Sequence, residues 1–95
     1  MKDFANVVVL SDEVYDFLTF DGLEHIRFAT IGDNWHRTVS IYSGGKKMNA
    51  TGWKVGWAIG PENILKLGGI INNTTCYCTN TPGQVALSKA LPIAD

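Results

Sequence analysis

The chain has 95 residues, of which 45% are hydrophobic and 18% are charged, and its eight basic and nine acidic residues leave a formal net charge of −1. This balance lacks the basic surplus that binding to a nucleic acid backbone requires, so we exclude nucleic acid as a partner. No apolar run approaches the ~20 residues of a transmembrane helix, and we expect neither a membrane-spanning segment nor a signal peptide.

The first predicted element is a strand at residues 6–10. Its sequence, NVVVL, is a continuous β-branched run without alternation, which is typical of a strand covered on both faces in an α/β sheet. The polar segment SDEVYDF follows at once, so acidic and hydroxyl groups gather after this strand. Residues 16–37 contain two glycine turns and no clear helical period, although a short helical piece near 23–29 is compatible with them.

Two further strands are predicted in the middle of the chain. TVSIY at 38–42 alternates between apolar and polar residues, and VGWAIG at 55–60 is rich in apolar residues, with Gly56 indicating close approach of another backbone. The connection at 43–54 is long for a hairpin and contains two lysines behind two glycines. Because long loops inside small domains are usually functional, we expect it to carry a site.

Two helices complete the predicted fold, at residues 62–76 and 82–91. The first starts at Gly60-Pro61-Glu62 and places an apolar stripe on one face. The second starts with Thr81 as the N-cap and Gln84 three residues later, a capping-box pattern. We therefore predict an α/β fold over residues 1–95, with a three-stranded mixed sheet and two helices.

The cysteines and histidines do not indicate a metal site. Cys76 and Cys78 have a spacing that is poor for an intrachain disulfide and supplies two of the four ligands of a structural zinc. We expect buried or half-buried free thiols in a reducing compartment. His25 and His36 have no partner at ligand spacing.

The polar residues after the first two strands indicate a binding site. In open α/β sheets, ligands bind at the carboxyl ends of the strands. If the first two strands are parallel, Asp12, Tyr15, Ser43 and Lys46 converge on that edge. An acid, a phenol, a hydroxyl and an amine would then face one crevice.

Two segments carry a resemblance to a known family. SDEVYDFLTFDG and HRTVSIYSGGKKMNATGWKVGWAIGP resemble the central part of the large domain of fold-type I, pyridoxal-phosphate-dependent aminotransferases. The similarity is greatest to the class I/II group that contains kynurenine aminotransferases, also called glutamine transaminase K or cysteine-S-conjugate β-lyases. It covers roughly residues 5–90, and although each motif alone is common, their joint spacing is specific.

The resemblance implies pyridoxal 5'-phosphate as the cofactor and gives five residues a role. Asp12 corresponds to the carboxylate that pairs with the protonated ring nitrogen, and Tyr15 to the tyrosine that hydrogen-bonds the ring 3'-oxygen. Lys46 corresponds to the catalytic lysine that forms the Schiff base and shuttles a proton. Ser43 and Lys54 correspond to the contacts with the cofactor phosphate.

Ordinary structural interpretations of the same residues remain open. Asp12 is also a suitable residue to end a strand, and lysines are most often solvated surface residues. Trp53 and Trp57 are interpreted as packing residues. Between the adjacent amines we choose Lys46 as the cofactor lysine, with Lys47 as its solvated neighbour.

The predicted function is that of an aminotransferase fragment. The parent enzyme would move an amino group between an L-amino acid and a 2-oxo acid of the kynurenine or glutamine type, as a homodimer in the cytoplasm or the mitochondrion. The family's glycine-rich phosphate turn, ring-stacking aromatic and substrate-binding arginine have no counterpart here, so we expect this chain alone to be inactive. The alternative is a non-catalytic remnant that serves as a structural or assembly module.

Overall fold

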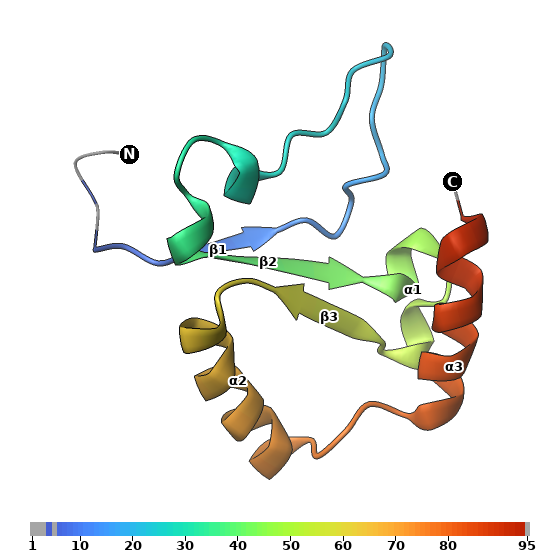
Figure 1. Cartoon of the computed structure of the whole chain (residues 1–95). Helices are drawn as coiled ribbons and strands as arrows, with labels where there is room; N and C mark the ends of the chain where they lie inside the picture. The colour runs from blue at the N-terminus through green and yellow to red at the C-terminus, as the bar shows by residue number, and fades with distance from the viewer. Residues whose placement is uncertain (1–3, 5, 95) are drawn as a thin grey trace.

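The chain forms an α/β unit built around one three-stranded sheet. A computed structural model describes residue 4 and residues 6–94 (Figure 1). The strands are β1 (Val9–Asp12), β2 (Thr38–Ser43) and β3 (Gly56–Ile59), in the order β1-β2-β3. β1 pairs with β2 in parallel and β2 pairs with β3 antiparallel, so the predicted mixed sheet is confirmed.

The first strand lies further along the chain than predicted. Val9 pairs with Thr38, the first residue of β2, and Asp12 pairs with Ile41. Residues 6–8 come before this point and have no strand partner, although their sequence favours a strand. Asp12 is therefore the last residue of β1 and does not follow a strand that has already ended.

A short helix follows β2 directly, where the sequence predicted an irregular loop. α1 (Gly44–Lys47) is succeeded by a 3-10 turn at Thr51–Trp53 before β3 begins. Two glycines are poor helix formers, so tertiary hydrogen bonds must hold this segment. The Gly44 N–H donates to the Val55 carbonyl at 3.1 Å, and the Ala50 N–H donates to the Gly45 carbonyl at 2.8 Å.

The two long helices form as expected, with one cap assigned wrongly. α2 is Glu62–Thr75 and α3 is Thr81–Ala90. Asn80, and not Thr81, is the N-cap of α3, because its side chain accepts the Gly83 N–H at 2.7 Å. The predicted capping box is absent, since the Gln84 side chain donates to the Thr79 carbonyl. Asn80 also donates to the Trp53 carbonyl at 2.8 Å, which ties α3 to the turn before β3.

Few apolar side chains are buried in this unit. Among the described residues, the buried hydrophobic ones are Ala29, Val39 and Val55. Leu10 of β1 is 68% exposed, and α2 buries no residue, with Leu67 of its predicted apolar stripe 65% exposed. Figure 1 shows α1 and α3 at one end of the sheet and α2 beside β3.

The overall dimensions agree with this sparse core. The Cα radius of gyration is 15.0 Å, and the extents are 43 × 43 × 18 Å. A compact domain of this length has a radius of gyration of about 12 Å. The sheet and α2 therefore present apolar surface that a complete domain would cover.

We predict that the 95-residue chain by itself associates with further copies or with a partner, because burying this apolar surface is favourable. Sedimentation and thermal melting across a series of protein concentrations measure this. The expected result is a mass above that of the monomer and a melting temperature that rises with concentration. A sharp, concentration-independent transition of a monomer would contradict it.

Candidate cofactor site

The parallel pairing of β1 with β2 brings the predicted site residues to one edge. Asp12 is the last residue of β1, Ser43 is the last residue of β2, and Lys46 follows in α1. Side chains alternate between the faces of a sheet, and paired residues share a face. Asp12 pairs with Ile41, and Ser43 lies two residues further along β2. Alternation alone would put Asp12 and Ser43 on one face, but Ser43, the last residue of β2, lines a cleft on the other face together with Tyr42 and Lys47. Asp12 and Ser43 therefore share the carboxyl end of the strands, not a face of the sheet.

Two of the other predicted site residues lie in turns. Tyr15 follows Asp12 closely, is 56% exposed, and has its ring 6.5 Å from that of Phe17. Lys54 is exposed and has a left-handed backbone with φ of 54° at the end of the 3-10 turn before β3. The carboxyl ends of β1 and β2 thus carry Asp12 and Ser43, and Lys46 follows Ser43 in α1. Tyr15 lies in the turn after β1, and Lys54 lies in the turn before β3.

Asp12 also has the structural role that the sequence left open. Its Oδ1 accepts the Val14 N–H at 3.2 Å, so its carboxylate stabilises the turn after β1. The side chain is exposed, and a carboxylate that accepts one hydrogen bond has capacity for more. Stabilising the turn and binding a ligand are compatible uses of this group.

The chemistry of these side chains fits pyridoxal phosphate. A carboxylate suits a protonated pyridine nitrogen, an amine suits an aldehyde, and a hydroxyl and an ammonium suit a phosphate. Asp12, Lys46, Ser43 and Lys54 supply these groups. Gly44 and Gly45, between Ser43 and Lys46, are both buried.

The two glycines differ in what a side chain would meet. A Cβ on Gly45 would lie 2.8 Å from the Thr51 Cα and 3.1 Å from the Ala50 carbonyl oxygen, both backbone atoms. A Cβ on Gly44 would lie 2.6 Å from the end of the Leu87 side chain, which can rotate away. Gly45 is therefore the position where α1 and the following turn require glycine.

We predict that Gly45→Ala lowers the free energy of unfolding by about 1–3 kcal/mol, because the backbone of Thr51 must move to admit the methyl group. Gly44→Ala is the matched control, and its cost should be smaller since Leu87 can change rotamer. Urea unfolding of both variants measures the difference. Equal midpoints, or a larger loss for Gly44→Ala, would contradict the prediction.

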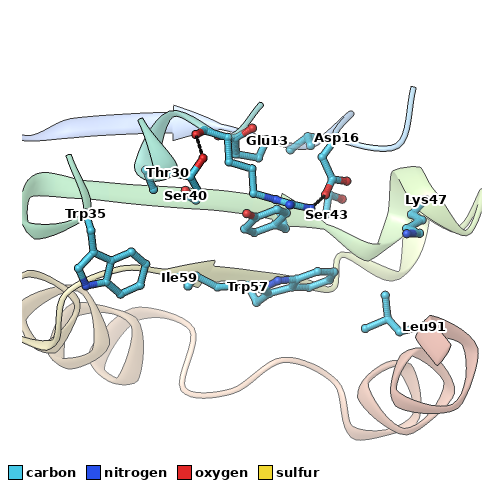
Figure 2. Close-up of a pocket in the computed structure, with 14 residues that line it drawn as sticks. Glu13, Asp16, Thr30, Trp35, Ser40, Ser43, Lys47, Trp57, Ile59 and Leu91 are labelled. Carbon is cyan, nitrogen blue, oxygen red and sulfur yellow. Dashed lines mark hydrogen bonds and ion pairs between the residues drawn. The ribbon is translucent and has the colours of Figure 1, made fainter. Parts of the chain in front are cut away.

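A second feature is an open cleft of about 390 Å³ on the other face of the sheet (Figure 2). Ser40 and Tyr42 of β2 and their partners Ile59 and Trp57 of β3 line it, and the predicted site residue Ser43 at the end of β2 lines it as well. The rings of Tyr42 and Trp57 are stacked, 5.6 Å apart and 9° from parallel. The interpretation of Trp57 as a packing residue is thus in keeping with the structure.

Charged residues that the sequence did not predict as site residues also line this cleft. Arg27 donates to the Asp16 carboxylate at 2.8 Å, and this hydrogen bond raises the pKa of the Arg27 guanidinium. Lys47 lines the cleft and is half-buried, so it is not the fully solvated side chain that we expected. Lys46 and Lys47 therefore differ in their surroundings, with Lys47 directed to the cleft.

The most buried ionisable group near the site is Glu13, which is 3% exposed. Its carboxylate accepts hydrogen bonds from the Ser11 hydroxyl at 2.8 Å and the Phe28 N–H at 3.3 Å, and it also pairs with Nε2 of His25. Burial raises the pKa of the Glu13 carboxyl, but the hydrogen bonds from His25, Ser11 and Phe28 outweigh this and hold the pKa below its ordinary value of 4.5. A sequence signal existed, because Glu13 directly follows Asp12 and strand alternation turns it to the opposite face.

We predict that acid destabilises the wild-type chain through Glu13. Because its folded-state pKa lies below the ordinary value of 4.5, the carboxylate contributes stability that is fully present above about pH 4.5 and is lost as the pH falls through the folded-state pKa. Urea unfolding between pH 7 and 3 measures this, with Glu13→Gln as the variant that lacks the titration. Equal pH dependence in both proteins would show that Glu13 does not contribute.

Other sequence predictions have mixed outcomes. Cys76 and Cys78 are free but exposed, so the expectation of buried or half-buried thiols was wrong. Within the part of the chain that the structure describes, no group of three or more His, Cys, Asp or Glu residues could hold a metal ion. No helix in that part is long and apolar enough to span a membrane.

Comparison with known proteins decides the family. The sequence profile of the family described as "Aminotransferase class I and II" matches residues 1–94. The chain belongs to this family. Membership implies that the full-length enzymes depend on pyridoxal phosphate, in agreement with the resemblance that the motifs carry.

Individual relatives lead to the same family. The chain is 53% identical over 93 residues to a kynurenine–oxoglutarate transaminase of Dictyostelium discoideum, which covers 95% of the chain and 21% of that protein. It is 42% identical over 84 residues to kynurenine–oxoglutarate transaminase 1 of Rattus norvegicus, which covers 88% of the chain and 20% of that protein. The chain thus spans about a fifth of the length of these relatives.

A solved structure shares the fold. The N-succinyldiaminopimelate aminotransferase from Mycobacterium tuberculosis superimposes with a TM-score of 0.90 and 38% identity, over 96% of this chain and 24% of that one. The unit described above is therefore part of an aminotransferase domain, as predicted. The sparse core is understandable on this basis, because about three quarters of that larger chain lies outside the match.

Proposed function

We propose that the chain is the central part of the cofactor-binding large domain of a pyridoxal-phosphate-dependent aminotransferase. The parent enzyme moves an amino group between an L-amino acid and a 2-oxo acid, with substrates of the kynurenine or glutamine type, and acts as a homodimer. The observation that carries the proposal is the parallel β1–β2 pairing, which places Asp12 and the Ser43–Lys46 segment at one sheet edge in a chain of this family.

The residues at this edge would divide the work as follows. When bound, pyridoxal phosphate supplies an electron sink for the substrate. The Asp12 carboxylate holds the proton on the ring nitrogen, and the Tyr15 hydroxyl donates to the ring oxygen. The Lys46 amine would take a proton from the substrate Cα and deliver it to C4' of the cofactor.

The phosphate end would be held by a hydroxyl and a point charge. Ser43 lies at the end of β2, one turn before Lys46, so its hydroxyl and the Lys46 amine belong to one short rigid segment. Lys54 supplies an ammonium from the turn before β3. The hydrogen bond from Asn80 to the Trp53 carbonyl braces that turn against the start of α3.

A non-catalytic structural or assembly module is the second candidate. It is favoured by the exposure of Leu10 and of the apolar residues of α2, which provide surface for association without chemistry. The two candidates differ in what they require of Lys46, because an assembly module gives this amine no special reactivity.

We predict that reaction of the chain with pyridoxal phosphate, followed by borohydride reduction and peptide mass spectrometry, labels Lys46 ahead of the exposed Lys66 and Lys89. Asp12 and the phosphate contacts should raise the local concentration of the aldehyde at Lys46. We expect no measurable transamination by the chain alone, since it lacks most of the parent's length.

The matched controls are Lys46→Arg and Lys47→Arg, which keep the charge and remove one amine each. Selective labelling should disappear in the first and persist in the second. Labelling that is spread evenly over the surface lysines would contradict the proposed site and favour the assembly module.

A further inference from the structure

Asp12 and Glu13 are adjacent acids, and only one of them can face the candidate cofactor site. Asp12 is the last residue of β1 and Glu13 directly follows it, so alternation turns their side chains to opposite faces of the sheet. A slip of one residue in the β1–β2 register would exchange the two faces and present Glu13 where Asp12 now lies. Something in this segment must distinguish the two acids.

The Glu13 surroundings make this distinction. Three donors converge on its buried carboxylate, namely the Ser11 hydroxyl, the His25 ring and the Phe28 N–H. Asp12 receives one hydrogen bond, from the Val14 N–H, and is exposed. If Asp12 took the place of Glu13, its carboxylate would lie too far from the three donors to accept all their hydrogen bonds, because the aspartate side chain is one methylene shorter.

The Glu13 carboxylate also joins the two ends of the long loop at residues 17–27. Residues 17–27 contain no helix or strand, are exposed, and leave and return to the sheet in a wide loop (Figure 1). Glu13 lies at the outgoing end, and His25 and Phe28 lie at the returning end. Its backbone is fixed as well, since the Glu13 N–H donates to the Ile41 carbonyl at 2.9 Å and its carbonyl accepts the Asp16 N–H at 3.1 Å.

We propose that Glu13 is a positioning residue for the cofactor acid: by burying its carboxylate against Ser11, His25 and Phe28, it fixes the register that presents Asp12 at the edge beside Ser43 and Lys46. The inference rests on the proposed function for the identity of the ligand. Glu13 lines the cleft on the face of the sheet opposite the Asp12 side chain, a cleft that Ser43 also lines, and its effect on Asp12 passes through the backbone of the segment that carries both acids.

The first experiment measures the anchor without any ligand. Hydrogen exchange of the 95-residue chain is followed by mass spectrometry in the wild type, Glu13→Gln and His25→Asn, with Asp16→Asn as the control. Asp16 is a nearby acid whose carboxylate pairs with Arg27 and does not contact the Glu13 carboxylate. Peptides that cover residues 11–16 should exchange about tenfold faster in the first two variants, with those of β3 unchanged.

The second experiment separates positioning from general stability. Borohydride labelling of Lys46 is compared between pyridoxal phosphate and its 1-deaza analogue, in which a CH group replaces the ring nitrogen that Asp12 would contact. The wild type should prefer pyridoxal phosphate, and Glu13→Gln should reduce that preference severalfold, while Asp16→Asn retains it. A loss of stability alone would reduce labelling by both compounds equally and leave the preference unchanged.

The outcomes are distinguishable. Wild-type labelling without selectivity for Lys46 overturns the proposed function, and hydrogen exchange then decides the anchor by itself. Unchanged exchange at 11–16 in both Glu13→Gln and His25→Asn, or wild-type exchange there as fast as in a free peptide, overturns the anchor. Faster exchange with an unchanged preference between the two compounds overturns the positioning of Asp12 and leaves Glu13 a structural residue.

Discussion

The parallel register between β1 and β2 is the constraint on which the rest of this structure depends. Pairing of Asp12 with Ile41 sets the end of β1 beside the end of β2, and α1 follows β2 without an intervening residue. Only a parallel pair brings two carboxyl ends to one edge, so the acid of one strand and the amine that follows the other become neighbours through topology. Residues that are more than thirty positions apart in sequence thereby form one candidate site.

The two faces of this small sheet are used differently. The Asp12 carboxylate lies on one face, whereas the other face carries the buried Glu13, the stacked Tyr42 and Trp57, and the cleft, which Ser43 at the end of β2 also lines. Strand alternation produces this division, since neighbouring residues in β1 and β2 turn to opposite sides. Hydrogen bonds to the buried Glu13 carboxylate connect the end of β1 to the loop at residues 17–27 that precedes β2.

The energetics of the chain are those of a part of a domain. Its secondary structure is complete and locally satisfied, with no buried side-chain nitrogen or oxygen among the described residues left without a hydrogen-bond partner. Apolar burial is what is scarce, as Leu10 and Leu67 illustrate. Backbone hydrogen bonds contribute modestly to net stability, whereas apolar burial is the main favourable term, so the elements can form here while the core remains thin.

Local signals in the sequence determined the three strands, the two longer helices and their order. β-branched residues predicted the strands, Pro61 and Pro82 marked the helix starts, and Gly56 marked a close backbone approach, where a Cβ would lie 2.7 Å from the Tyr42 carbonyl oxygen. The motif spacing also indicated the family correctly. These features depend on residues near one another in the chain, so the sequence alone is enough to predict them.

Tertiary structure decided what depends on distant partners. β1 begins at Val9 because β2 begins at Thr38, and α1 forms because its glycines meet the backbone of Val55 and Ala50. Asn80 became the cap of α3, and Glu13 gained two of its three donors, His25 and Phe28, from a distant segment for which the sequence predicted no regular element. Burial, register and long-range hydrogen bonds are properties of pairs of segments, and neither segment specifies them alone.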